Sequence, residues 1–232
     1  MEETKKDWHL YENDFFSGLV TEKNSFMSLA KKQNYKKKSI LFLKDELGNS
    51  CFYVQEGIIK IYNSTVEGKE PIFFLRKKGD MFGIADLVNS EVRKANAETL
   101  TSTTVWKLGK VDFETLLDKH HLFSKRIIQV LGKRIRYLGQ TIENLMVCDV
   151  ATRLAKLLVY LTLDVLSDQE SWESPTSVPI SLTQEQMADM TGSCQQTISE
   201  TLKCFQDKGM IKMDKKRIII HNPLSLLSCV RK

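Results

Sequence analysis

The spacing of hydrophobic and polar positions changes along the chain and predicts two kinds of structure. Between residues 36 and 108, short runs rich in Ile, Phe, Tyr and Val alternate with turns, and glycines recur every nine to eleven residues at Gly48, Gly57, Gly68 and Gly79. Short strands with this turn spacing are typical of an all-β sandwich or barrel. The predicted strands cover Ser39–Leu43, Cys51–Glu56, Ile58–Asn63, Pro71–Arg76, Ala95–Thr101 and Thr104–Leu108. Residues 1–35 are predicted to be mostly helical or irregular.

From Val111 to Leu166 the apolar residues recur at helical spacing. Six of them follow one another at steps of 3, 4, 3, 4 and 3, namely Ile128, Leu131, Ile135, Leu138, Ile142 and Leu145. An a/d pattern of this kind predicts a helix that pairs with a copy of itself, although it extends over only about two and a half heptads. The alternative is a helix packed on its own domain. We interpret the flanking Lys133, Arg134 and Arg136 as a solvated face.

The next segments predict a hinge, a second apolar helix and a connection. Cys148–Asp149 is expected to separate the long helix from Val150–Leu166, which is again apolar at helical spacing. Ser167–Pro179 is rich in Ser and acidic residues, carries two prolines, and is expected to be a loop or hairpin connection. We place the domain boundary at Asp149, with the loop as the alternative, because a helix that ends at a hinge can transmit motion.

A helix-turn-helix pattern begins at Ser181. Ser181 or Thr183 can cap a first helix, with Glu185 or Gln186 in its first turn. Gly192 marks a tight turn, since a crossing of two helices needs a residue that tolerates positive φ. Ser193 is expected to cap a second helix that buries Ile198, Leu202 and Phe205 and ends at Gly209. Met210–Met213, the turn Asp214–Lys216 and Arg217–His221 then predict a basic β-hairpin, or wing.

A helix, a glycine turn, a helix and a basic hairpin form a winged helix-turn-helix, whose second helix enters the major groove of DNA. Gln195 and Gln196 lie at the start of that helix; glutamine can pair with adenine, and a glutamate such as Glu200 can accept from cytosine. Ser193, Thr197, Lys203 and the wing lysines would hold phosphates. The predicted DNA-binding residues are Ser193, Gln195, Gln196, Thr197, Ser199, Glu200, Lys203, Lys215 and Lys216. The alternative is a helical protein-interaction domain with an ordinary polar face.

Composition and charge agree with a globular protein that meets a polyanion. Hydrophobic residues make up 42% and charged residues 27% of 232 residues, and the formal net charge is +5. Residues 180–232 hold eight basic and five acidic side chains. The five cysteines are scattered without a C-x-x-C pair, which argues against a disulfide framework and a structural zinc site. The first ten residues are polar and no apolar run reaches the ~18 residues of a membrane span, so we expect a reduced, cytoplasmic protein.

The chain as a whole resembles the cAMP receptor protein/FNR (Crp/Fnr) family of bacterial transcription regulators. The segments that carry the resemblance are FYVQEGIIKIY, KKGDMFG, CDVATRLAKLLVYL and TQEQMADMTGSCQQTISETLK followed by GMI, together with the glycine-spaced roll and the seam helix. The resemblance implies an α+β homodimer: a double-stranded β-helix (jelly-roll) sensor in residues 1–110, a dimerisation helix in 111–148 and a winged helix-turn-helix in 149–232. It also implies that an effector reorients the DNA readers toward a palindromic operator, with RNA polymerase as a further partner if the protein activates.

Departures from the family pattern bear on the effector. The family's nucleotide cassette has Gly-Glu-Leu and an Arg-Ser/Thr-Ala stretch, whereas this chain has Gly79-Asp80-Met81 and Arg93-Lys94-Ala95. The family's hydroxyl pair on the central helix is Leu138-Gly139 here, so cAMP is not expected. The candidate effector-binding residues are Gly79, Asp80, Met81, Phe82, Arg93, Lys94 and Leu138. No cysteine precedes Cys51, which argues against the iron–sulfur cluster of the FNR branch, and the four histidines give no persuasive haem ligand.

The strands are rich in aromatic residues, which fill the core of the roll or line a ligand cage. If a pocket survives, Arg93 and Lys94 favour a small anionic or aromatic metabolite as the effector, and no other cofactor is expected. Two other classes of protein remain open: a cupin-like β-roll enzyme and a cyclic-nucleotide-binding adaptor without DNA activity. The enzyme needs a metal or acid/base cluster, yet residues 36–108 contain no histidine; the adaptor would not need a winged helix. We therefore predict a DNA-binding regulator with no catalytic or metal-binding residues.

Overall fold

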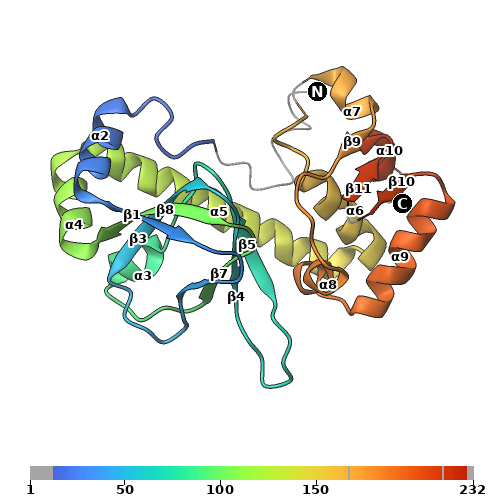
Figure 1. The fold of residues 1–232 in the computed structure, drawn as a ribbon, viewed down its shortest axis with the longest axis horizontal. Helices are drawn as coiled ribbons and strands as arrows, with labels where there is room; N and C mark the ends of the chain where they lie inside the picture. The colour runs from blue at the N-terminus through green and yellow to red at the C-terminus, as the bar shows by residue number, and fades with distance from the viewer. Residues whose placement is uncertain (1–12, 167, 216, 229–232) are drawn as a thin grey trace. The chain divides into compact units, whose positions relative to one another are not determined.

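The protein folds as two compact units. The structure is a computed structural model that describes residues 13–166, 168–215 and 217–228. One unit lies within residues 12–136 and the other within residues 137–232. The helix α5 (His121–Val147) belongs to both, because the division falls between Arg136 and Tyr137. The two units are shown in Figure 1.

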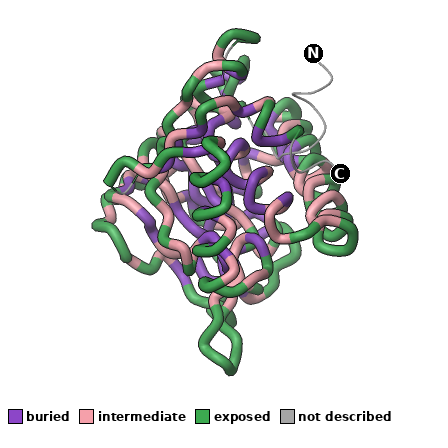
Figure 2. The backbone as a smooth tube through the Cα atoms, turned by 90° about the vertical axis from the view of Figure 1, so that its right-hand side faces the viewer, coloured by how far each residue is buried: buried purple, intermediate pink, exposed green. Residues whose placement is uncertain are grey.

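The first unit is built on a β-roll. Its strands are β1 (Lys31–Tyr35), β2 (Ile40–Phe42), β3 (Ser50–Glu56), β4 (Ile59–Tyr62), β5 (Ile72–Arg76), β6 (Met81–Phe82), β7 (Asn96–Thr99) and β8 (Thr103–Gly109). The described residues form two antiparallel four-stranded sheets, in the orders β1-β8-β3-β6 and β2-β7-β4-β5. The predicted jelly-roll and each of the six predicted strands are confirmed. Residues 64–69, which join β4 to β5, are exposed throughout and project from the roll (Figure 2).

Two strands and a short helix of this unit were not predicted from the sequence. β1 lies in a segment predicted to be helical or irregular; it is polar, and it becomes a strand because Lys31–Tyr35 pairs with Thr103–Lys107 of β8. β6 has only two residues, and it pairs with β3. α3 (Ile84–Asn89) follows immediately. Both strands depend on a partner far away in the sequence, which local patterns do not report.

Helices cover the roll and share its largest apolar core. α2 (Val20–Leu29) and α4 (Lys110–Lys119) pack side by side (Figure 1). His120 leaves the helical conformation and separates α4 from α5, so the helical stretch that starts at Val111 is divided. The break lets Phe113 and Phe123 meet edge to face, with ring centroids 5.8 Å apart. Both are fully buried in one apolar cluster with Phe15 and Phe16, which precede α2, and with residues of the roll.

The second unit contains the rest of α5 and a compact C-terminal domain. Its other elements are α6 (Val150–Tyr160), α7 (Gln169–Glu173), β9 (Thr176–Ser177), α8 (Gln184–Thr191), α9 (Gln195–Asp207), β10 (Ile211–Asp214), β11 (Arg217–Ile220) and α10 (Pro223–Ser228). The break at Cys148–Asp149 is confirmed: Asp149 caps α6 by accepting from the Thr152 backbone N–H at 2.7 Å. The connection after α6 has more structure than predicted, because it holds α7 and the strand β9 that joins the wing sheet.

Candidate nucleic-acid interface and sensor interior

The first half of the interface is the α8–turn–α9 unit. Thr183 caps α8 in a capping box, in which its hydroxyl accepts from the Gln186 backbone N–H at 3.1 Å and the Gln186 side chain accepts from the Thr183 N–H at 2.9 Å. Gly192 ends the helix with φ +62°, a conformation that a side chain would strain. α8 and α9 pack on each other and on α6 (Figure 1). The predicted helix, glycine turn and helix are confirmed.

The start of α9 differs from the prediction in one residue. Cys194, not Ser193, is the N-cap: its backbone is extended (φ −111°, ψ 158°), and the thiol lies 3.2 Å from the Thr197 hydroxyl. Ser193 belongs to the turn, because its N–H donates to Ala188 O and so continues the end of α8. Hydrogen bonds from Thr197 lower the pKa of the exposed Cys194 thiol.

α9 separates an apolar face from a polar face. Ile198, Leu202 and Phe205 are buried, as the spacing predicted. Among the predicted DNA-binding residues the exposed ones are Gln195, Gln196, Ser199, Glu200, Lys203 and Lys215, whereas Ser193 and Thr197 are half-buried. The Gln196 amide donates to Glu200 Oε1 at 3.0 Å, one helical turn away, so these two side chains hold each other in place.

The wing is the antiparallel hairpin β10–β11, with β9 beside β11. Lys215 stands at its tip with a left-handed backbone (φ +55°). Lys216, which was also predicted to contact DNA, lies outside the described residues. The exposed side chains of Lys212 and Arg217 add two positive charges to the same hairpin.

Arg153 braces this unit and was not recognised from the sequence. Its Nε donates to Thr191 O at 2.7 Å and its Nη1 to Cys148 O at 2.6 Å. One guanidinium on α6 thus ties the turn before α9 to the end of α5, both within the second unit. The only sequence signal is a single arginine within the apolar run of Val150–Leu166.

The interior of the β-roll is filled by stacked aromatic rings and one arginine. Phe42, Phe52 and Phe82 are buried, and the Phe52 and Phe82 rings stack at 5.1 Å. Arg93 is 1% exposed, and its guanidinium carbon lies 4.2 Å from the centroid of the Phe42 ring. The interpretation that aromatic residues fill the core of the roll therefore holds for these three rings.

Arg93 is held by main-chain and carboxylate oxygens. It donates to Ser50 O, to Gly83 O at 3.0 Å and to Asp86 Oδ2 at 3.3 Å. Burial lowers the pKa of Arg93, and the bond and charge of Asp86 act in the opposite direction. Gly83 has φ +74°, and a Cβ there would lie 3.1 Å from Arg93 Nη1, so the close approach requires glycine. The Nε of Arg93 is buried without a hydrogen-bond partner among the described residues.

The other candidate effector residues do not all lie in the interior of the roll. Gly79, Asp80, Met81 and Phe82 are buried in or beside β6, and Asp80 closes a turn by accepting from the Lys77 N–H at 2.9 Å. Lys94 is exposed and pairs with Glu91 at 3.5 Å, unlike its buried neighbour. Leu138 belongs to the other unit, on α5. Gly83, Ser50 and Asp86, which surround Arg93, were missed because their contacts to it depend on the fold.

The a/d residues of α5 form an exposed apolar stripe. Ile128 and Ile135 are each 71% exposed, Leu138, Ile142 and Leu145 are also exposed, and Leu131 is partly buried against the roll's outer core. The alternative of a helix packed on its own domain holds for a neighbouring stripe of the same helix, where Phe123, Ile127 and Val130 are buried. Arg134 departs from the predicted solvated face: it is half-buried and donates to Met81 O at 2.7 Å.

The described part of the chain offers little support for a metal site, a membrane span or a reactive thiol at Cys51. Within it, no group of three His, Cys, Asp or Glu residues could hold a metal ion. None of its helices is long and apolar enough to cross a membrane. Cys51 is fully buried, which raises its thiol pKa to about 12.

A β-roll, a long helix and a winged helix-turn-helix that exposes a polar recognition face define the class of two-domain DNA-binding regulators. Residues 32–120 match the cyclic nucleotide-binding domain family, and residues 152–229 match the Crp-like helix-turn-helix domain family. The CRP-like cAMP-activated global transcriptional regulator of Mycobacterium tuberculosis is 25% identical over 180 residues, which cover 78% of this chain and 79% of that protein.

Further relatives agree with this assignment. The cAMP-activated global transcriptional regulator CRP of Salmonella typhimurium is 23% identical over 84% of this chain and 92% of its own length. The solved structure of a CooA mutant from Carboxydothermus hydrogenoformans has the same fold, with a TM-score of 0.75, 23% identity and coverage of 96% of this chain and 98% of that one. The chain belongs to the Crp/Fnr family of transcription regulators, which join an effector-binding domain to a DNA-binding helix-turn-helix. Its relatives are regulators and not enzymes.

Proposed function

We propose that this protein is a cytoplasmic homodimer that recognises a palindromic operator with α9 and is controlled by a small effector other than cAMP. The observation that carries the proposal is the exposed polar face of α9 above a fully buried apolar stripe of Ile198, Leu202 and Phe205. A helix held in this way can enter a major groove without losing its packing. If the protein activates transcription, RNA polymerase is a further partner.

In this proposal the start of α9 reads the bases. Gln195 and Gln196 can each make a bidentate pair with adenine, and Glu200 can accept from cytosine, so we expect a half-site that contains A·T pairs. The hydrogen bond between Gln196 and Glu200 fixes both side chains before DNA binds. Phosphate contacts are assigned to Ser193, Thr197, Ser199, Lys203, Lys215 and Lys216.

Dimerisation is assigned to the stripe Ile128, Leu131, Ile135, Leu138, Ile142 and Leu145. Its exposed isoleucines and leucines supply an apolar surface that water disfavours, and their a/d spacing fits a parallel pair of helices. A twofold axis between the helices would give each α9 an equivalent half-site, which is the reason for expecting a palindrome.

The effector site is assigned to the roll interior around Arg93, with Gly79, Asp80, Met81, Phe82 and Lys94 as further candidates. Asp86 balances the Arg93 charge, so an anionic effector would have to compete with that carboxylate. Lys94 is exposed and paired with Glu91, which supports Arg93 as the main anion ligand. Together with the apolar ring stack, this favours a small anionic or aromatic metabolite over cAMP.

Selection of bound sequences from a random DNA pool tests the proposed function. We expect inverted repeats whose half-sites contain adenine and whose centres lie about one helical turn apart, roughly 10–10.5 base pairs. The selection should be repeated with Gln195→Ala/Gln196→Ala, which is expected to lose enrichment at the adenine positions. Enrichment of single sites or direct repeats by the unchanged protein would contradict the palindromic mode.

A further inference from the structure

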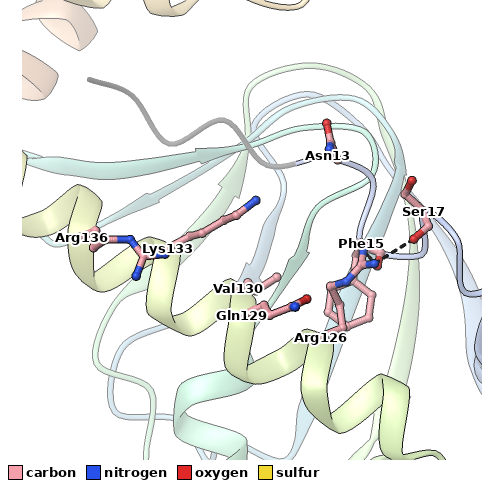
Figure 3. Close-up of a pocket in the computed structure, with 8 residues that line it drawn as sticks. All are labelled: Asn13, Phe15, Ser17, Arg126, Gln129, Val130, Lys133 and Arg136. Atoms are coloured by element: carbon pink, nitrogen blue, oxygen red, sulfur yellow. Dashed lines mark hydrogen bonds between the residues drawn. The ribbon is translucent and has the colours of Figure 1, made fainter. Parts of the chain in front are cut away.

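A cavity lies outside the β-roll, between α5 and the segment that precedes α2. It has a volume of about 330 Å³ and lies wholly within the first unit. Figure 3 shows Arg126, Gln129 and Lys133 extending from successive turns of α5. Asn13 and Ser17 stand on the facing segment. The volume is at the lower end of the range for small-molecule sites, about 300–1,000 Å³.

The cavity has a fixed wall. Arg126 Nη1 donates to Phe15 O at 2.6 Å, and its Nη2 donates to Ser17 O at 2.8 Å. The Phe15 N–H donates in turn to Gly79 O at 2.8 Å, and the Phe15 ring is buried in the aromatic core. Because backbone, guanidinium and ring all hold this segment, the cavity exists before any ligand arrives.

The described part of the lining is positively charged. Arg126, Lys133 and Arg136 all line the cavity, and the described residues of its lining include no Asp or Glu. Asp14 is adjacent in sequence, but its carboxylate accepts from the Tyr53 hydroxyl at 2.7 Å and from the Phe16 N–H at 2.8 Å. Among the described residues, Lys133 and Arg136 have neither a hydrogen-bond nor an ion-pair partner. Three cations therefore meet at a concave surface where a small anion would supply the missing charge.

The cavity would stay open in a dimer. At about 100° per residue, Arg126, Gln129, Lys133 and Arg136 lie on the side of α5 roughly opposite the a/d stripe centred on Ile135. Pairing of that stripe with a second copy therefore leaves these residues free to meet a ligand.

We propose that this cavity is a second ligand site, distinct from the roll interior, that binds a compact phosphorylated metabolite with at least two negative charges. The Arg136 guanidinium matches two phosphate oxygens, and the Lys133 ammonium adds a point charge. Gln129 and Asn13 offer amide groups to hydroxyls or carbonyls of the same molecule. Phe15 and Val130 give the floor an apolar surface for its carbon skeleton.

Calorimetric titration of the full-length protein with inorganic pyrophosphate at constant ionic strength tests the site. We expect one pyrophosphate per protomer. Lys133→Gln/Arg136→Gln is expected to weaken binding at least tenfold, on the order of two lost charge-assisted hydrogen bonds. Both side chains are exposed, so the variant should fold as the parent does, which its circular dichroism and melting temperature would verify.

Two control variants carry the same change in charge elsewhere. Lys119→Gln/Lys125→Gln alters exposed lysines outside the cavity, and Lys203→Gln/Lys212→Gln alters the proposed DNA-binding face. Both are expected to bind pyrophosphate within twofold of the parent. Absence of saturable binding to the parent, or equal affinity in all four proteins, would overturn the proposal. Loss confined to Lys203→Gln/Lys212→Gln would place the anion on the DNA-binding face and would also refute it.

Discussion

Two helices of this protein, α5 and α9, each bury one stripe and expose another, and the exposed stripes differ in chemistry. α5 buries Phe123 and Ile127 against the roll and exposes Ile128 and Ile135. α9 buries Ile198, Leu202 and Phe205 and exposes glutamine, serine, glutamate and lysine. An exposed apolar stripe is expected to pack against another protein surface, whereas an exposed polar face with basic neighbours suits a groove lined with phosphates and base edges.

The exposed faces of α5 and α9 are expected to have different roles. Burial of the α5 stripe in a dimer gains the hydrophobic free energy of several large side chains, on the order of 1.5–3 kcal/mol each. Bidentate hydrogen bonds from α9 discriminate between bases instead, by about 1–3 kcal/mol each. Assembly is therefore expected to depend mainly on α5 and sequence choice mainly on α9.

The largest effect is expected from breaking the α5 stripe. Ile135→Lys/Ile142→Lys puts charges into the proposed seam, and the dimer dissociation constant should rise at least 100-fold, because four isoleucines per dimer are lost. Sedimentation equilibrium would measure it, and operator affinity should fall in parallel. Val111→Lys, an exposed apolar residue outside the stripe, is the matched control. A variant that sediments like the parent would contradict the seam.

The next effect concerns base reading by α9. Gln195→Ala/Gln196→Ala should weaken binding to the selected operator about 10–100-fold, since each bidentate pair discriminates by about 1–3 kcal/mol. Binding to random DNA should change little. Fluorescence anisotropy with both duplexes would separate the two quantities. Gln206→Ala, near the other end of the same helix, should bind like the parent; equal losses on both duplexes would show that the glutamines do not read bases.

A smaller effect is expected from one phosphate contact. Lys203→Gln should reduce the slope of log affinity against log salt by about 1 and weaken specific and random DNA alike. Titrations at several salt concentrations would measure this slope. Lys119→Gln removes the same charge from α4 and should leave the slope unchanged. An unaltered slope in Lys203→Gln would remove Lys203 from the interface.

The smallest effect concerns the cap of α8. Thr183→Ala removes the hydroxyl that accepts from the Gln186 N–H and should lower the free energy of unfolding by about 1 kcal/mol. Urea unfolding followed by circular dichroism would measure it. Thr183→Ser retains the hydroxyl and should recover most of the loss. Equal stability of the alanine variant and the parent would mean that the capping box contributes nothing.

Local patterns predicted the winged helix-turn-helix well, because its defining contacts join near neighbours in sequence. The Thr183–Gln186 box, the Gly192 turn and the buried stripe of α9 each involve residues a few positions apart. The N-cap of α9 was predicted one residue too early, because serine is a preferred cap residue, whereas the Ser193 N–H donates to the Ala188 carbonyl and so belongs to the end of α8.

The sensor was predicted only in outline, because its important contacts join distant residues. Arg93 meets Ser50, which is 43 positions away, and Arg126 reaches Phe15 across 111 positions. β1 is too polar to be recognised until β8 pairs with it. Lys133 and Arg136 are exposed as expected, but only the position of the facing segment makes their surface a cavity.

The most direct test is a crystal structure of the full-length protein bound to its selected operator. We predict a dimer joined along the α5 stripe, with two α9 helices in successive major grooves about 34 Å apart and Gln195 and Gln196 at base edges. A complex in which α9 faces away from the duplex, or in which a single protomer binds, would contradict it.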